Sequence, residues 1–542
     1  MRRLFFLTLT VVSWLSAAAI DRTAAAMQRI ADRQLNAMGI AETSALLDET
    51  PACAIYGSSA GGFVVVNRNA DGRQVLGYST SVYNPGHMPC GFDWWLNAVS
   101  EAQQHGSLKR ASSRKYNPVD NFLKTRWGQD TPYNEKCPKL SGKRPPAGCI
   151  ATAMAQVMRY YEWPAQGQGM GGYYVNDHFV DEAVDGTYSW DKMPNVPYSA
   201  GTKKDIRAAV STLLYDCGKA VKMQYDLDGS GAYQFDQALA LARNFQYDSL
   251  SLQYCERYLY DTDQWMDMID GEIQAGRPIL YSGDDANGKG GHAFVFSGID
   301  ADGNVWVNWG WTGSGDGYYA VDLLDVSPYR FANGQEMNIG IKPMASTGPD
   351  GVYRSKWAVY LSAAPAVTPD HRHLTIPYYY IYNAHFLPFT GSVGLYIRST
   401  DGQDYGQLKL VEEMATQELA YGEGYTNIND DNTYEPVELS FDELPIGCYQ
   451  VCWASKAVQE TDVQAMLDEN SAQLSAPFFM AKNDNGTLSC SDQEITTAVR
   501  AVATQTADTA PRYYRPDGRP ATAAGRGLTI VRQGSTVRKI VR

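Results

Sequence analysis

The chain has 542 residues, 44% of them hydrophobic and 20% charged, which is the composition of a globular protein with room for three or four domains. Its formal net charge of −14 argues against a nucleic-acid surface, because such a surface needs clustered Lys and Arg to neutralise phosphates. Nine cysteines are too sparse for a disulfide scaffold, and their odd number predicts at least one free thiol.

The first residues have the pattern of a secretory signal peptide. A charged start at residues 1–3 precedes an apolar run at residues 4–18, and the small residues 17–19 favour cleavage near Ile20. We therefore expect residues 1–19 to be a signal peptide and the protein to be secreted or attached to the cell surface. No later run of about 18 apolar residues occurs, so no transmembrane segment is expected.

A small α+β unit is predicted for residues 20–114. Residues 24–47 read as a helix, and short strand-like runs follow at residues 54–56, 62–66 and 75–78, separated by Gly, Asn and Asp turns.

The end of this unit is basic and rich in small residues. Residues 109–115 are Lys-Arg-Ala-Ser-Ser-Arg-Lys, a composition typical of exposed segments that proteases cut. We predict a cleavage linker here, with an ordinary solvated loop as the alternative.

The central region is dense in Gly, Trp and Tyr, and its pattern changes from helices to strands along the chain. Helices followed by antiparallel strands predict an α+β domain. We assign this domain to residues 115–345. Its predicted helices are residues 150–161, 204–217 and 233–245, and its predicted strands are 278–281, 292–296 and 305–309, the last two forming a hairpin.

The last third of the chain reads as β-rich. Short strand patterns predict a β-sandwich over residues 346–490. Cys448 and Cys452 lie on one face of a single predicted strand, so a disulfide between them is not expected. Residues 491–512 are rich in Ala and Thr and read as a linker. Residues 513–542 carry seven basic residues against one acidic residue and resemble C-terminal sorting segments of proteins exported by gram-negative bacteria.

Cys149 is the candidate nucleophile. It opens a helical run, and the orphan N–H groups and positive dipole end of a helix N-terminus favour a thiolate. The small residues Ala147 and Gly148 would let a substrate carbonyl approach. We take Cys149 as the free thiol, with a cysteine simply buried in the core as the alternative.

His292 is the candidate base. Only His178 and His292 lie in the central region, and His178 sits in a polar stretch. His292 opens an apolar strand after two glycines, and it follows Cys149 within the range of about 130 to 150 residues quoted for papain-like peptidases.

Other side chains suggest supporting roles. Asn308, on the partner strand, could orient the imidazole, and Trp309 and Trp311 could shield that hydrogen bond from water. The side-chain amide of Gln129 could join the backbone N–H of Cys149 at an oxyanion. A turn residue, core tryptophans and a surface glutamine are the respective alternatives.

Together these motifs resemble the successive signatures of streptopain-type cysteine peptidases over residues 117–342, and residues 62–66 with 75–78 are similar to the inhibitory propeptide of that family. The matching segments are Trp127-Gly128-Gln129, Pro132-Tyr133-Asn134, Cys137-Pro138, Gly148-Cys149-Ile150-Ala151-Thr152-Ala153-Met154-Ala155-Gln156, Gly290-Gly291-His292-Ala293-Phe294-Val295, Asn308-Trp309-Gly310-Trp311 and Asp316-Gly317-Tyr318.

The resemblance implies a secreted, papain-like α+β cysteine endopeptidase that is made as a zymogen, acts on proteins and peptides, and needs no cofactor or metal. Its own propeptide would be its intramolecular inhibitor, and the family favours an apolar residue two positions before the scissile bond. The implied site residues are Cys149 as nucleophile, His292 as general base and acid, Gln129 at the oxyanion, Trp309 and Trp311 beside the histidine, and Ser230 and Gly291 lining the cleft.

Three alternatives stay open. The chain could be a surface adhesin with a relic peptidase domain, although the complete Cys, His, Gln and Trp set argues against this. It could be an amidase or acyltransferase that uses the same Cys-His pair. Residues 226–230 suggest a calcium loop, but the carboxylate-rich continuation of such a loop is missing.

Overall fold

The computed structural model describes residues 21–104, 106, 108, 114–284, 291–324, 334–400, 406–410, 418–429, 433–469, 474–495, 512–514, 520–521, 528–533 and 536–541. The predicted signal peptide lies outside these residues, as do most of the predicted cleavage linker and most of the Ala- and Thr-rich linker. In the described part of the chain, no helix is both long enough and apolar enough to cross a membrane.

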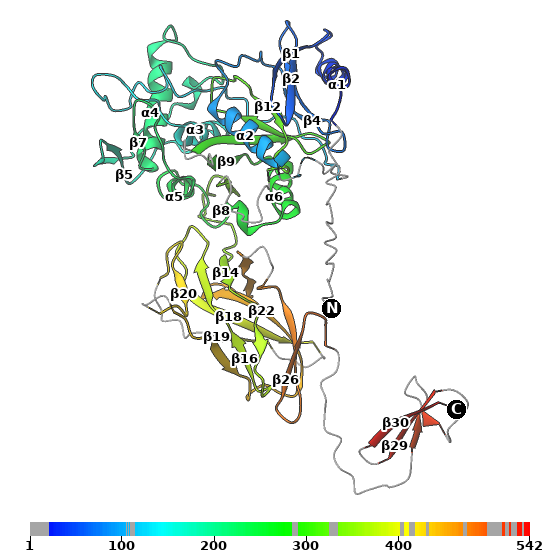
Figure 1. The fold of residues 1–542 in the computed structure, drawn as a ribbon. Coiled ribbons are helices and arrows are strands. Elements are labelled where there is room, and N and C mark those ends of the chain that lie inside the picture. The colour runs from blue at the N-terminus through cyan, green and yellow to red at the C-terminus, as the bar shows by residue number, and fades with distance from the viewer. Residues whose placement is uncertain are drawn as a thin grey trace, which may run out of the picture.

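The N-terminal unit is a four-stranded antiparallel sheet between two helices (Figure 1). Apolar side chains alternate along its strands, so that one face packs on α1 and the other on α2. The elements are α1 (Ala24–Ala37), β1 (Ala45–Glu49), β2 (Cys53–Gly57), β3 (Phe63–Asn67), β4 (Val75–Ser79) and α2 (Cys90–Gln104).

The first helix is shorter than predicted. It ends at Ala37, and Gly39 follows with a φ of +83°, a conformation that side chains disfavour. Residues 45–47, which the sequence assigned to the same helix, instead belong to β1, which pairs with β2. Strand pairing therefore overrides the local helix propensity of this Ala- and Leu-rich run.

One sheet of ten strands joins the N-terminal unit to the central domain, in the order β1-β2-β3-β4-β12-β11-β10-β9-β13-β8. The junction is the pairing of β4 with β12, where Ser79 faces Gly317 and Gly77 faces Tyr319. The predicted hairpin is confirmed by the register of Val295 opposite Asn308. The central strands are β8 (Gln253–Glu256), β9 (Ile279–Asp284), β10 (Gly291–Ile299), β11 (Val305–Asn308), β12 (Gly317–Tyr319) and β13 (Glu336–Ile339).

Two helical layers cover this sheet. One face carries α3 (Cys149–Tyr161), α4 (Lys204–Ala220) and α5 (Gln234–Asn244), and the other carries α2 and α6 (Thr262–Gln274). The alternation along β10 separates the two cores, because Ala293 and Val295 face α3 while Phe294 and Phe296 face α2 and α6.

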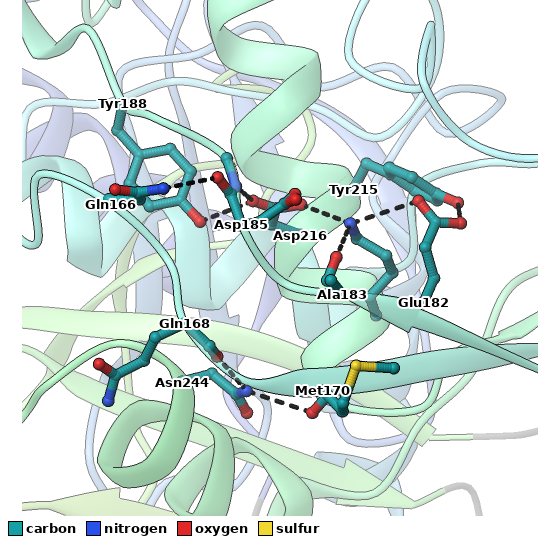
Figure 2. A network of polar contacts seen from close by, with 12 residues as sticks. Gln166, Gln168, Met170, Glu182, Ala183, Asp185, Tyr188, Tyr215, Asp216 and Asn244 are labelled. Atoms are coloured by element: carbon teal, nitrogen blue, oxygen red, sulfur yellow. Dashed lines mark hydrogen bonds and ion pairs between the residues drawn. The ribbon is translucent and has the colours of Figure 1, made fainter.

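A buried ion pair fixes a small sheet beside α4, made of β5 (Met170–Val175), β6 (His178–Ala183) and β7 (Gln224–Tyr225). Lys219 lies 2.9 Å from Asp216, and both side chains are almost fully buried. Lys219 also contacts Glu182 and donates to the carbonyl of Ala183, while Asp216 accepts from the hydroxyl of Tyr188 (Figure 2). The network therefore ties β6 and the loop after it to α4.

Residues 357–491 form stacked β-sheets around a core of their own. Strands of two sheets contribute to that core, for example Trp357 and Ile381 from one and Leu395 and Trp453 from the other. The strands are β14 (Trp357–Leu361), β15 (Ala366–Val367), β16 (His373–Ile376), β17 (Tyr379–Asn383), β18 (Gly391–Ser399), β19 (Gly406–Leu410), β20 (Gly424–Thr426), β21 (Val437–Ser440), β22 (Gly447–Ala457), β23 (Gln464–Ala465), β24 (Leu467–Asp468), β25 (Phe478–Lys482) and β26 (Leu488–Ser491).

The basic tail contains strands that the sequence did not predict. β27 (Arg512–Tyr514), β28 (Pro520–Ala521), β29 (Leu528–Gln533) and β30 (Thr536–Val541) form a sheet in the order β28-β27-β29-β30. All nine cysteines are free thiols, including Cys448 and Cys452 within β22.

Candidate active site

Cys149 is the first residue of α3, and the residue before it must be glycine. Gly148 has a φ of +92°, and a Cβ atom there would lie 2.6 Å from Cε of Met223 and 3.1 Å from the carbonyl oxygen of Ser230. A side chain at position 148 would therefore be strained and would clash. The close packing places Cys149 at a sharp entry into the helix.

Cys149 is half-buried and lines a cavity. Burial raises the pKa of this thiol, and hydrogen bonds from the backbone N–H groups of Ala293, Ile150 and Cys149 itself lower it only in part. The helix N-terminus favours the thiolate, as the sequence suggested, but desolvation prevails in this arrangement. Burial therefore favours the protonated thiol over the thiolate.

His292 lies near the start of β10, and its ring contacts the N-terminal unit. Nδ1 of His292 is 3.1 Å from Sγ of Cys90, the first residue of α2. Burial, together with the proximity of Cys149, raises the pKa of Cys90 to about 12, so Cys90 keeps its proton and can donate it to Nδ1. His178, the other histidine considered, is exposed on β6.

Helix α2 is held tightly against the sheet beside His292. The indole N–H of Trp94 donates to the carbonyl of Asp284 over 2.9 Å. A Cβ at Gly283 would lie 2.1 Å from the Trp94 ring, and one at Gly91 would lie 2.8 Å from the Trp309 ring. These two glycines allow α2 to approach the strand that carries His292.

Sequence reasoning missed Cys90. The aromatic run after it, with Trp94 and Trp95, indicated a helix, but nothing local to residues 89–91 pointed to a histidine 202 residues away. Only the docking of α2 on β10 brings the two side chains together.

Asn308 is held by hydrogen bonds to three neighbouring segments. Its amide NH2 donates to the carbonyl of Thr125 and to Oε1 of Gln156, and its Oδ1 accepts from Nε2 of Gln156 and from the N–H of Gly310. Both donors and both acceptor positions are therefore occupied. The orienting role of Asn308 towards His292 stays a prediction.

The two tryptophans lie in different surroundings. Trp309 is buried, its ring packs 4.8 Å from that of Phe294, and its indole N–H donates to the carbonyl of Gly315. The buried carboxyl of Asp316 accepts from the backbone N–H of Trp309. Trp311 is only half-buried, in the turn that follows.

The remaining predicted residues surround the entry to α3. The carbonyl of Gln129 accepts from the N–H of Ala147, which places Gln129 beside the segment leading to Cys149, and its oxyanion role stays a prediction. The hydroxyl of Ser230 donates to the carbonyl of Pro146 over 2.7 Å. Ser230 thus supports the wall behind the nucleophile.

Cys149 and His292 line one cavity of about 500 Å³. Gly291 lies on its rim, where a Cβ would come 2.2 Å from a carboxyl oxygen of Asp284. Among the described residues, no group of three or more His, Cys, Asp or Glu is arranged to hold a metal ion. The cavity is lined further by Ile150, Tyr174, Val221, Lys222, Gln224, Gly231, Ala232, Tyr233, Gln234, Asp236, Ser282, Asp284, Ala293 and Glu336.

Comparisons with known proteins agree with this geometry. Residues 127–319 match the model of the Peptidase C10 family. The thiol protease/hemagglutinin PrtT of Porphyromonas gingivalis is 31% identical over 321 residues, which are 53% of this chain and 36% of that protein. Streptopain of Streptococcus pyogenes is 28% identical over 324 residues, which are 53% of this chain and 80% of that protein. The match thus spans about a third of PrtT and most of streptopain.

A solved structure matches as well. It is a fragment of prointerpain A from Prevotella intermedia, a Cys-to-Ala mutant, with 34% sequence identity and a TM-score of 0.50. The match covers 56% of this chain and 99% of the prointerpain fragment.

Proposed function

Because this chain belongs to the Peptidase C10 family of streptopain-like, papain-like cysteine peptidases, we propose that it is a secreted cysteine endopeptidase made as a zymogen. The observation that carries the proposal is the shared cavity of Cys149 and His292, with the nucleophile at a helix N-terminus. Protein and peptide chains are the substrates, and residues 20–114 act as the intramolecular inhibitor.

The reaction follows from these groups. In the processed enzyme, His292 takes the proton of Cys149, and the thiolate attacks the peptide carbonyl. The backbone N–H of Cys149 and the side-chain amide of Gln129 stabilise the tetrahedral oxyanion. His292 then protonates the leaving amine, and a thioester remains. Water attacks the thioester with His292 as base, which releases the carboxylic acid and restores the thiol.

Two features of the described residues support the proposal that this form is an inactive precursor. Nδ1 of His292 contacts the thiol of Cys90, and burial raises the pKa of Cys149. A histidine whose Nδ1 is engaged by the thiol of Cys90 is not available to take the proton of Cys149. Cleavage near residues 109–115 would release α2 and free His292. The similarity to prointerpain A supports a pro-form, since that name denotes a precursor.

The test is an assay on an unstructured protein, with and without reducing agent, combined with labelling by a thiol-directed peptide epoxide. We expect Cys149→Ala to abolish cleavage, self-processing and labelling while the protein stays folded. Cys452→Ser in the β-rich region is the matched control and should behave as wild type. Thiol-dependent hydrolysis that survives in Cys149→Ala would contradict the assignment, and product transfer to added amines in place of water would favour an acyltransferase.

A further inference from the structure

The catalytic cavity extends from Cys149 and His292 to an acidic end. Three carboxyl side chains line that end, and they come from different elements: Asp236 from α5, Asp284 from β9 and Glu336 from β13. Small residues such as Ser282 and Ala293 line the cavity beside larger ones such as Tyr174 and Tyr233. A carboxyl group at one end of a cavity suits a long side chain with a cationic tip.

The strand register connects Glu336 to the nucleophile. Ala293 on β10 pairs with Ser282 on β9, and Ser282 pairs with Glu336 on β13. Directly paired residues of antiparallel strands point to the same face of a sheet, so these three side chains form one row on the α3 face. The first member of the row supplies the N–H that contacts the thiol of Cys149.

The length of this row fits one particular substrate residue. Neighbouring strands lie about 4.8 Å apart, so Glu336 is two strand spacings, about 10 Å, from Ala293. Consecutive Cα atoms of a substrate are about 3.8 Å apart. One substrate residue covers part of the distance from Ala293 to Glu336. A long side chain on the residue before the attacked residue can therefore cover the rest of that distance.

Glu336 lies among other acidic groups. Burial raises the pKa of Glu336 to about 8; the hydroxyl of Tyr254 opposes this, and the like charges of Glu256 and Asp284 add to it. Nearby cations act on its neighbours. Lys356 favours the anion of Glu256, and Lys222 and Arg243 favour the anion of Asp236.

We propose that Glu336 makes this end of the cavity a pocket for a Lys or Arg side chain two positions before the scissile bond. The proposal rests on the proposed peptidase function, and it departs from the apolar preference that the family resemblance implies. The aliphatic stem would lie along Ala293 and Ser282, and the cation would bind the carboxylate of Glu336.

The test compares peptides that differ only at this position, with Leu, Arg, Lys or Glu, using the processed enzyme. We expect wild type to prefer Arg and Lys over Glu. Glu336→Gln should lower kcat/KM for the Arg peptide by about tenfold or more and should lower it much less for the Leu peptide. Asp236→Asn, at the same wall but near Lys222 and Arg243, is the control and should have a smaller effect.

The outcomes separate the two proposals. Cleavage of the Leu peptide by wild type with no advantage for basic residues over Glu overturns the pocket and leaves the peptidase assignment standing. An equal loss of kcat/KM on the Leu and Arg peptides in Glu336→Gln indicates a folding defect. The preference of wild type across the four peptides then decides whether the pocket binds basic side chains. No cleavage of any peptide overturns both proposals.

Discussion

Sγ of Cys90 lies 3.1 Å from Nδ1 of His292, although 202 residues separate them in the chain. The contact exists because α2, the last helix of the N-terminal unit, packs on the face of β10 that carries Phe294. The same unit also extends the central sheet through the pairing of β4 with β12. The N-terminal unit therefore contacts His292 directly and shares a sheet and a core with the central domain.

Replacing Cys90 should speed the self-processing of the proposed zymogen. We expect Cys90→Ala to process itself several-fold faster than wild type, because Nδ1 of His292 loses its partner while most of α2 still packs. Cys90→Ser keeps a hydroxyl donor, so its rate of self-processing should lie between those of Cys90→Ala and wild type. The measurement is the half-time of appearance of the processed chain by mass spectrometry. Ser100→Ala, in the same helix and bonded only to the carbonyl of Leu96, is the control; equal half-times for all variants would remove Cys90 from the latency mechanism.

Substrate preference should depend on pH through Glu336. Because its pKa is raised to about 8, the carboxylate forms only as the pH rises through that value. Since kcat/KM follows the ionisation of the free enzyme, the ratio of the Arg peptide to the Leu peptide should increase between about pH 6 and about pH 9. Tyr254, Glu256, Asp284, Asp236 and Lys222 also face this region.

The variant Glu336→Gln isolates the pH effect, because it removes one titrating group and leaves those neighbours in place. Its ratio of Arg to Leu turnover should stay flat over the same pH range. A wild-type ratio that is equally flat would show that Glu336 does not bind the substrate cation.

The buried pair of Lys219 and Asp216 should be a large contributor to stability. Lys219→Met leaves the carboxylate of Asp216 buried without its cation, which costs on the order of 3 to 5 kcal/mol. Denaturant unfolding of the Cys149→Ala background measures the change without self-cleavage. The exposed pair of Lys192 and Asp205 is the matched control, and Asp205→Asn should change stability by less than about 1 kcal/mol. A Lys219→Met protein as stable as the control would refute the argument.

His385 should make the protein sensitive to acid. Burial, together with the charge of Lys356, lowers the pKa of this side chain to about 3, and its Nδ1 accepts from the N–H of Leu387. The unfolded chain binds a proton below about pH 6.5, whereas the folded chain does not until about pH 3. Stability is therefore fully present above pH 6.5 and declines as the pH falls towards 3, by a few kcal/mol.

The variant His385→Asn tests this, because asparagine keeps an acceptor near the position of Nδ1 and does not titrate. Its unfolding midpoint should fall less between about pH 7 and about pH 4 than that of wild type. His178→Gln, at an exposed position, should follow the wild-type curve. Parallel curves for all three proteins would assign the acid sensitivity to other groups.

Much of the secondary structure of the central domain could be predicted from local sequence patterns. The helix after Cys149 follows from apolar spacing over a single run, and the hairpin of β10 and β11 follows from two apolar strands joined by a short turn. The first helix was extended too far, because residues 45–47 have good helix propensity and only their pairing with β2 makes them part of a strand. The strands of the basic tail were missed, because basic composition carried more weight than the alternation within β29 and β30.

The sequence by itself determined the chemistry of this protein: a cysteine at a helix start, a histidine at a strand start, and the order of motifs between them. These features are local, and each is written in a few consecutive residues. Only the tertiary structure decided the surroundings of these side chains. Packing between distant segments produces the desolvation of Cys149, the contact of His292 with Cys90 and the row from Ala293 to Glu336. Long-range packing sets the burial and charge around a side chain, and no short stretch of sequence encodes it.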